Sequence, residues 1–105
     1  MQAEKFKAKA KIIQALASPV RLQIVDELSR GECCICELQP LFEMNKSTLS
    51  RHVTALRNVG IVSGRREGTR LMLKLETPCI LKIFECTMGV IQAEATRHMK
   101  LAQES

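Results

Sequence analysis

NKSTLSRHVTALRNVG, residues 45–60, is the stretch of sequence that decides the fold. It begins with asparagine, a residue type that caps helix N-termini, and it ends with glycine, which is typical of the position after a helix. Apolar residues recur between these ends at helical spacing. They are Leu49, Val53, Leu56 and Val59. The stretch therefore predicts an amphipathic helix with one inward apolar stripe and a polar outer face.

A shorter helix is expected directly before this one. Residues 32–44 read ECCICELQPLFEM, and their apolar members are Ile35, Leu38, Leu41 and Phe42. Because Pro40 fits only the first turn of a helix, we expect the helix to begin near residues 35–37. Cys33 and Cys34 are then expected in the preceding turn. Two helices joined by a few residues form a candidate helix-turn-helix.

After Gly60 the apolar pattern changes from helical to alternating. In IVSGRREGTRLMLKLE, residues 61–76, the leucines at 71, 73 and 75 alternate with other side chains. Gly64 and Gly68 bracket a basic tip. Alternation interrupted by glycines predicts a two-stranded β-hairpin, a wing beside the helix-turn-helix.

The flanking segments predict three more helices. Residues 3–17 are amphipathic, Ser18-Pro19 combines an N-cap with a first-turn proline, and Thr77-Pro78 opens a long apolar-faced segment. The predicted fold class is mainly α (α+β): a winged helix-turn-helix of about five helices with a two-stranded β-hairpin wing. The first and last helices carry more apolar surface than one small domain needs, so we expect them to form the interface of a homodimer.

Length and charge narrow the class of protein. The 105 residues have room for one domain, which we place at 1–105. Sixteen Lys and Arg against eleven Asp and Glu give a net charge of +5, which favours a polyanionic partner such as nucleic acid. No apolar run approaches the roughly 18 residues of a membrane span, and the N-terminus is not a signal peptide. The sequence therefore predicts a cytoplasmic protein without a membrane partner.

The polar face of the 45–60 helix fits the reading of DNA bases. Arginine can bind guanine through a bidentate fork, and small hydroxyls reach bases or phosphates without bulk. Around Gly68, arginines are placed to follow a phosphate backbone or to enter the minor groove. The predicted DNA-binding residues are Ser47, Thr48, Ser50, Arg51, His52, Arg65, Arg66 and Arg70. His52 lies near the inward flank, so a packed or hydrogen-bonded role is an alternative there. A solvated helix face and a charged turn are the plainer alternatives for the others.

Three of the five cysteines, Cys33, Cys34 and Cys36, lie within four positions. An odd, uneven set does not suit a disulfide framework, whereas converging thiolates suit a soft metal ion or redox chemistry. In a regular helix the first and third would be about 60° apart, and the second and third about 200° apart. A turn before the helix is thus needed to gather all three. We also expect the helix N-terminus to lower the pKa of these thiols. Ordinary buried cysteines are the alternative.

Five motifs resemble the ArsR/SmtB family of arsenic- and metal-responsive repressors. Residues 32–38 resemble the family's ELCVCDL signature, and residues 17–22 resemble the start of its second helix. Residues 49–52 resemble its SRH recognition core, residues 56–62 its LRxxGLV helix ending, and residues 65–68 its wing turn. The resemblance covers nearly the whole chain.

The resemblance implies a homodimeric repressor that leaves an inverted-repeat DNA operator when a thiophilic ion binds. As(III) or Sb(III) is the expected inducer, Cd(II), Pb(II) or Zn(II) is the alternative, and no organic cofactor is implied. Cys34 and Cys36 carry over from the family motif, but the third cysteine of the arsenical branch is replaced by Gln39. Cys33 is the expected third ligand. Either Cys79 or Cys86 could serve instead or pair with the cluster in a redox reaction, although packing explains both.

Two rival functions use the same cysteines. A sulfide- or oxidant-sensing repressor would form a disulfide or polysulfide in place of an ion complex. A thiol reductase would use the CxxC spacing of Cys33 and Cys36, but it would need a βαβ unit that the sequence lacks. The sequence therefore predicts a regulator and not an enzyme. A zinc site on the last helix is disfavoured, because the Asp and His ligands of the zinc-sensing branch are reduced to His98.

Overall fold

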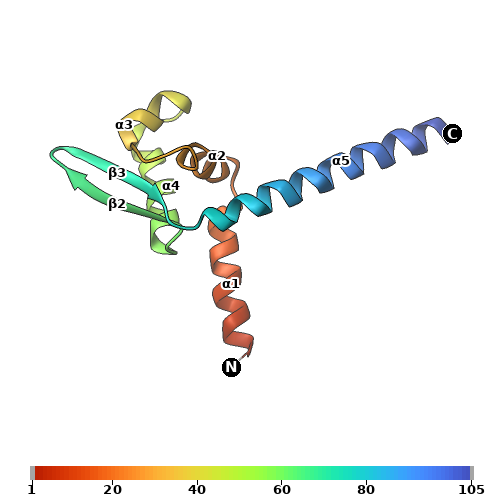
Figure 1. Ribbon diagram of the computed structural model, residues 1–105, viewed down its shortest axis with the longest axis horizontal. Coiled ribbons are helices and arrows are strands. Elements are labelled where there is room, and N and C mark those ends of the chain that lie inside the picture. Colours follow the sequence, from red (N-terminus) through yellow and green to blue (C-terminus); the bar gives the residue numbers. More distant parts are fainter. Residues whose placement is uncertain (1, 105) are drawn as a thin grey trace.

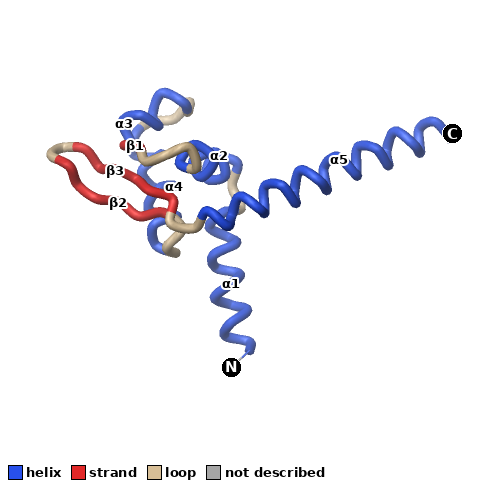
Figure 2. Tube along the Cα trace, viewed as in Figure 1, coloured by secondary structure: helices blue, strands red, loops and turns tan. Residues whose placement is uncertain are grey.

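The computed structural model describes residues 2–104, and Figures 1 and 2 show it as a small body with two projecting helices. Within these residues the elements are α1 (Gln2–Leu16), α2 (Pro19–Leu28), β1 (Cys33–Cys34), α3 (Ile35–Leu38), the 3-10 turn η1 (Gln39–Leu41), α4 (Lys46–Asn58), β2 (Val62–Glu67), β3 (Arg70–Leu75), the 3-10 turn η2 (Pro78–Ile80) and α5 (Leu81–Glu104). The predicted mainly α winged helix-turn-helix is confirmed. Met1 and Ser105, the ends of the predicted domain, lie outside the described residues.

Helix α4 forms where the sequence predicts it, and local interactions set both of its ends. The side chain of Asn45 accepts a hydrogen bond from the backbone N–H of Thr48 at 2.8 Å, which caps the first turn. Gly60 has a φ of +82°, a backbone conformation that ends the helix at little cost for glycine. The predicted stripe faces the core, with Leu49 and Leu56 fully buried.

The wing is the predicted hairpin of β2 and β3, and its turn contains Gly68 with a φ of +63°. The prediction that Gly64 borders the tip was wrong: Gly64 lies within β2, opposite Leu73, and strand pairing continues to Glu67 and Arg70. A Cβ at Gly64 would come within 3.1 Å of the Arg57 guanidinium carbon, so glycine lets this α4 side chain pack over the strand.

A third strand, β1, joins the outer side of β3 and gives the sheet order β1-β3-β2. Cys33 pairs with Leu73, and Cys34 pairs with Met72. The prediction of a turn at these two cysteines was therefore wrong. Their backbone is extended because β3 offers a free edge, and pairing there satisfies polar groups that a turn would have left to solvent.

The core lies between α2, α3, α4 and the sheet. Among its most buried side chains are Ile24, Leu38, Leu49, Leu56 and Leu73, each at most 1 % exposed. Apolar side chains from these separate elements thus anchor the recognition helix and the wing to one scaffold. None of the described helices is both long and apolar enough to span a membrane.

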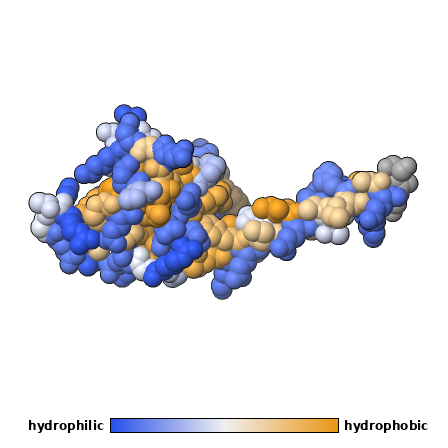
Figure 3. Space-filling view, turned by 90° about the horizontal axis from the view of Figure 1, so that it is seen from above, coloured by the Kyte–Doolittle hydropathy of each residue, from blue (hydrophilic) through white to orange (hydrophobic). Residues whose placement is uncertain are grey.

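Helices α1 and α5 leave this body in different directions (Figure 1). The radius of gyration is 17.1 Å, whereas a compact domain of this length has roughly 13 Å. Beyond its first turns α5 exposes large apolar side chains, among them Met88, Ile91 and Met99. Figure 3 shows apolar surface where the long helix joins the body and further apolar patches along it.

Candidate functional site

The outer face of α4 presents most of the predicted base-reading residues. Ser47 and Arg51 are exposed, and Thr48 and Ser50 are half-buried on the flanks. Arg51 makes no ion pair with any residue in the range 2–104. A long, unpaired guanidinium on an exposed helix face can donate to base edges without first giving up an intramolecular partner.

His52 takes the hydrogen-bonded role that the sequence left open beside base contact. Its Nδ1 accepts a hydrogen bond from Nε of Arg21 at 3.1 Å, and the same guanidinium donates to the carbonyl of Ala15 at 3.3 Å. The two bonds tie α4 to α2 and to the end of α1. Burial, followed by the positive charge of Arg21, lowers the pKa of His52.

This lowered pKa predicts a pH-dependent stability. As pH falls below about 6.5, the unfolded chain binds a proton at this imidazole before the folded chain does. The free energy of unfolding is therefore fully retained above that pH and falls as pH approaches the lower folded-state pKa of His52. We expect His52→Gln to flatten this slope in denaturant titrations at pH 7.5, 6.5 and 5.5. An unchanged slope in the variant would contradict the assignment.

The three wing arginines differ in their partners. Arg65 pairs with Glu32, which stands just before β1, and with Glu67 at 3.5 Å. Its bond to the Glu32 carboxylate raises the pKa of Arg65. Arg70 pairs with Glu37 at 2.6 Å. Arg66 is exposed and has no ion pair within the part of the chain that the structure describes.

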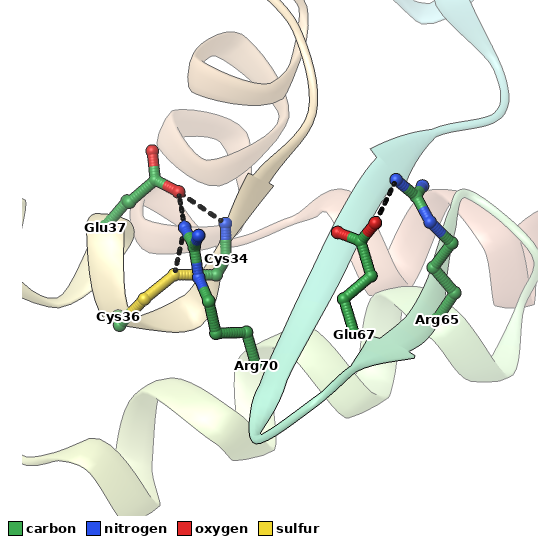
Figure 4. Close-up of polar contacts among 6 residues, drawn as sticks. All are labelled: Cys34, Cys36, Glu37, Arg65, Glu67 and Arg70. Atoms are coloured by element: carbon green, nitrogen blue, oxygen red, sulfur yellow. Dashed lines mark hydrogen bonds and ion pairs between the residues drawn. A yellow bond between two sulfur atoms is a disulfide. The ribbon is translucent and has the colours of Figure 1, made fainter.

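The sulfurs of Cys34 and Cys36 are joined in a disulfide, with their Cα atoms 5.2 Å apart (Figure 4). A regular helix through both positions would hold these two side chains about 200° apart. They meet because Cys34 precedes α3 in extended conformation, with φ −88° and ψ 163°, so its side chain folds over the first turn. The two cysteines that the family motif implies are thus brought together by the strand-to-helix junction.

Cys33 does not join this pair. It neighbours Cys34 along a strand, where successive side chains point to opposite faces, and it packs against the hydrophobic core. Burial, and then the charges of Glu37 and Glu27, raise the pKa of the Cys33 thiol. The predicted gathering of all three thiols and the lowered pKa at Cys33 were therefore wrong, because β1 pairing turns this side chain inward.

The cysteines of the last helical region lie elsewhere. Cys79 and Cys86 are free and exposed, in η2 and α5. Neither is near enough to the thiol pair to be grouped with it among the described residues. His98 lies 3.8 Å from Glu94 on the same helix. All strand pairs in the described chain are antiparallel, so the βαβ unit of a thiol reductase is lacking there.

Glu37 is the site residue that sequence reasoning missed. One of its carboxylate oxygens lies with the sulfurs of Cys34 and Cys36 in a group whose atoms are all within 4.8 Å of one another. Its position three residues after the N-cap was the available signal, because a glutamate there reaches back to the N-cap backbone. Here it accepts from the Cys34 N–H at 3.2 Å.

A pocket of about 320 Å³ opens beside the thiol pair, between α3, α4 and the wing. Both cysteines line it, and four cationic side chains surround it. They are Lys46, Arg57, Arg66 and Arg70. The pocket is thus an opening beside both cysteines that is surrounded by positive charge.

Comparisons with known proteins identify the family. Residues 18–63 match the family described as bacterial regulatory protein, arsR family. An arsenical resistance operon repressor of Staphylococcus xylosus is 37% identical over 70 residues, which are 67% of this chain and 67% of that protein. A cadmium resistance transcriptional regulatory protein CadC homolog of Staphylococcus aureus is 32% identical over 77 residues, 72% of this chain and 64% of that protein. The chain thus spans about two thirds of the length of these two relatives.

A solved structure agrees with the sequence comparison. The solution structure of a homodimeric winged helix-turn-helix DNA-binding domain from Mycobacterium bovis superposes with a TM-score of 0.70 and 32% identity. It covers 93% of this chain and 87% of that one. The chain belongs to the arsR family of bacterial regulatory proteins, which are winged helix-turn-helix DNA-binding transcriptional regulators and not enzymes.

Proposed function

We propose that this chain, as a single domain over residues 1–105, is a homodimeric repressor that leaves its DNA operator when a thiophilic ion binds Cys34 and Cys36. The observation that carries the proposal is the meeting of these two sulfurs beside the recognition helix and the wing. An ion held there would touch the scaffold that positions both DNA-reading elements. Binding to chromosomal DNA would place the protein in the cytoplasm.

The DNA-binding face consists of α4 and the wing. Arg51 and the hydroxyls of Ser47, Thr48 and Ser50 are proposed to read the major groove, and the wing arginines to hold the phosphate backbone. Arg66 has no ion pair among the described residues and can do so directly. Arg65 and Arg70 are held by carboxylates, but a guanidinium has five N–H donors and keeps some for phosphate. His52 is proposed to position α4 through Arg21.

The dimer interface is proposed to consist of α1 and α5. Their exposed apolar side chains, such as Phe6 and Ile91, have no covering element in the described chain. The Mycobacterium bovis relative with this fold is a homodimer. A twofold dimer would place its two recognition helices about 34–36 Å apart, one turn of DNA, which matches an inverted repeat.

As(III) or Sb(III) is the proposed inducer, and Cd(II), Pb(II) or Zn(II) is the alternative. Two thiolates select soft ions over magnesium or calcium. Relatives are named for arsenical and for cadmium resistance. The cysteine that would complete a three-thiolate site is absent at Gln39, and Cys33 faces the core. The ion would therefore be held by two sulfurs and a further donor.

The direct test is an anaerobic titration with arsenite of the reduced protein bound to a fluorescent inverted-repeat duplex, selected by the protein from randomised sequence. We expect release at about one equivalent per chain, because each chain carries one dithiol. Cys34→Ser and Cys36→Ser should each abolish release, since a single sulfur cannot chelate the ion.

Cys33→Ser and Cys86→Ser are the matched controls. Each removes one thiol outside the proposed site, so each variant should release DNA at the wild-type equivalence point. Release that survives in both Cys34→Ser and Cys36→Ser, or that disappears in Cys33→Ser, would refute the assignment of the thiol pair.

The Cys34–Cys36 disulfide favours a second candidate, a redox-sensing repressor. Oxidation of the dithiol by a diazene carboxamide would transfer two electrons and two protons to the oxidant and close the disulfide. In this case the oxidised protein would leave the duplex without any ion, and reduction would restore binding. Equal affinity of the reduced and oxidised forms for the duplex would eliminate this candidate.

A further inference from the structure

We propose that Glu37 is the third donor to an ion at Cys34 and Cys36, and that Arg70 of the wing competes with the ion for the Glu37 carboxylate. The inference rests on the proposed function and names the regulation of the same site. It makes one carboxylate the link between the ion and the wing. A set of two sulfurs and one oxygen fits a divalent thiophilic cation, because carboxylates complement thiolates around such ions.

The geometry shows one carboxylate oxygen with two competing partners (Figure 4). Oε1 of Glu37 accepts from the Arg70 guanidinium at 2.6 Å and from the Cys34 N–H at 3.2 Å. The same Arg70 nitrogen lies 3.5 Å from the sulfur of Cys34. The guanidinium thus occupies the space between carboxylate and sulfur, which is where a cation bound by both would lie.

The exchange needs no large rearrangement of the chain. Both side chains of the Glu37–Arg70 pair are about half exposed, at 51% and 53%, and an exposed ion pair of this kind is weak. Reduction by a phosphine supplies two electrons, and two protons from water convert the disulfide to two thiols. Ion binding then releases those two protons and takes the carboxylate from Arg70.

When Arg70 loses Glu37 as its ion-pair partner, the attachment of the wing to α3 changes. Arg70 is the first residue of β3, next to the hairpin turn, and Glu37 lies on α3. Their ion pair ties the tip of the wing to the helix-turn-helix. An ion that captures Glu37 removes this tie, and β1–β3 pairing and the Arg65–Glu32 ion pair remain. The tip of the wing is then held less firmly toward DNA. Linkage requires the converse as well: bound DNA should weaken ion binding by the same factor.

The test measures Cd(II) affinity of the reduced, DNA-free protein from its thiolate-to-metal charge-transfer absorbance, with a competing chelator. Glu37→Gln should bind the ion roughly tenfold more weakly or worse. Arg70→Gln should bind it more tightly, by up to about fivefold, because the competitor is gone. In the Glu37→Gln background, Arg70→Gln should tighten binding no more than Arg66→Gln does, because only the loss of a nearby positive charge remains. Competition thus predicts that the loss of Glu37 weakens Cd(II) binding and that the loss of Arg70 tightens it.

The chain offers matched controls for both changes of charge. Glu32→Gln and Arg65→Gln break the other ion pair between this segment and the wing, and both should leave Cd(II) affinity unchanged. Arg66→Gln removes a positive charge from the same pocket without freeing Glu37. The proposal is overturned if Arg66→Gln tightens binding as much as Arg70→Gln does, or if Glu37→Gln binds like wild type. If wild type binds no Cd(II) through its two thiols, this inference fails; the proposed function fails with it only if arsenite also leaves the protein on its duplex.

Discussion

Replacing Arg51 with alanine is expected to abolish the preference of the protein for its operator. Arg51 is exposed on α4 and has no ion pair among residues 2–104, so its guanidinium is available for a bidentate bond to guanine. One such contact discriminates by about 1–3 kcal/mol, and a dimer makes it twice. The loss is therefore roughly 30-fold to 10⁴-fold in operator affinity, with little change in binding to random DNA. Fluorescence anisotropy with the two duplexes at one salt concentration measures both.

Arg30→Ala is the charge-matched control for this prediction. Arg30 lies just after α2 and pairs with Asp26 and Glu27, so its loss removes the same charge away from α4. Its effect should be small and equal on operator and random duplexes. If Arg51→Ala lowered affinity for both duplexes equally, Arg51 would be a phosphate contact and the base-reading assignment would be wrong.

The double substitution Met88→Gln and Ile91→Gln is expected to convert the proposed dimer to monomers, and the monomers are expected to lose operator binding. Both residues are exposed on α5, at 52% and 60%, and lie on one helical face. A buried apolar side chain of this size contributes about 1.5–3 kcal/mol, and twofold symmetry counts each substitution twice. The dimer constant should therefore fall by roughly 10⁴-fold or more, which sedimentation velocity over a concentration series will show.

Val90→Gln is the control that distinguishes loss of the proposed interface from a general effect of placing a polar residue on α5. Val90 is 62% exposed but points about 200° away from Met88 around the helix axis. Its replacement removes a similar apolar area from a different face of the same helix, so the dimer should persist. A monomeric Val90→Gln variant, or a dimeric double variant, would show that the interface is formed by another face.

The recognition helix and the wing could be predicted from the sequence because their signals are local. Asn45 caps the helix through a backbone group three residues away, and Gly60 ends it through its own φ. The leucines of β3 alternate with period two, so the pairing of a hairpin follows from its own residues. The outward placement of Arg51 follows from helical geometry once the buried stripe is known.

The thiol site could be predicted only in part. Which cysteines belong to the site depends on whether Cys33 and Cys34 continue a helix, form a turn or add a strand. Their conformation is set by pairing with β3, which lies nearly forty residues later in the sequence. Because β1 pairs with β3, the side chain of Cys33 packs against the core and that of Cys34 reaches Cys36. The sequence did not predict Glu37 as a site residue, because its contact with the wing is made to Arg70, which lies 33 residues away in sequence.

The sequence by itself determined the winged helix-turn-helix, its basic reading face and the presence of a cysteine cluster beside it. Periodicity, caps and turns carry this information, because each depends on residues within one or two turns of chain. The tertiary structure alone decided which sulfurs meet, which carboxylate joins them and which wing arginine that carboxylate holds. These contacts arise when β1 pairs with the edge of β3, and a pairing between distant segments is fixed by the packing of the whole core.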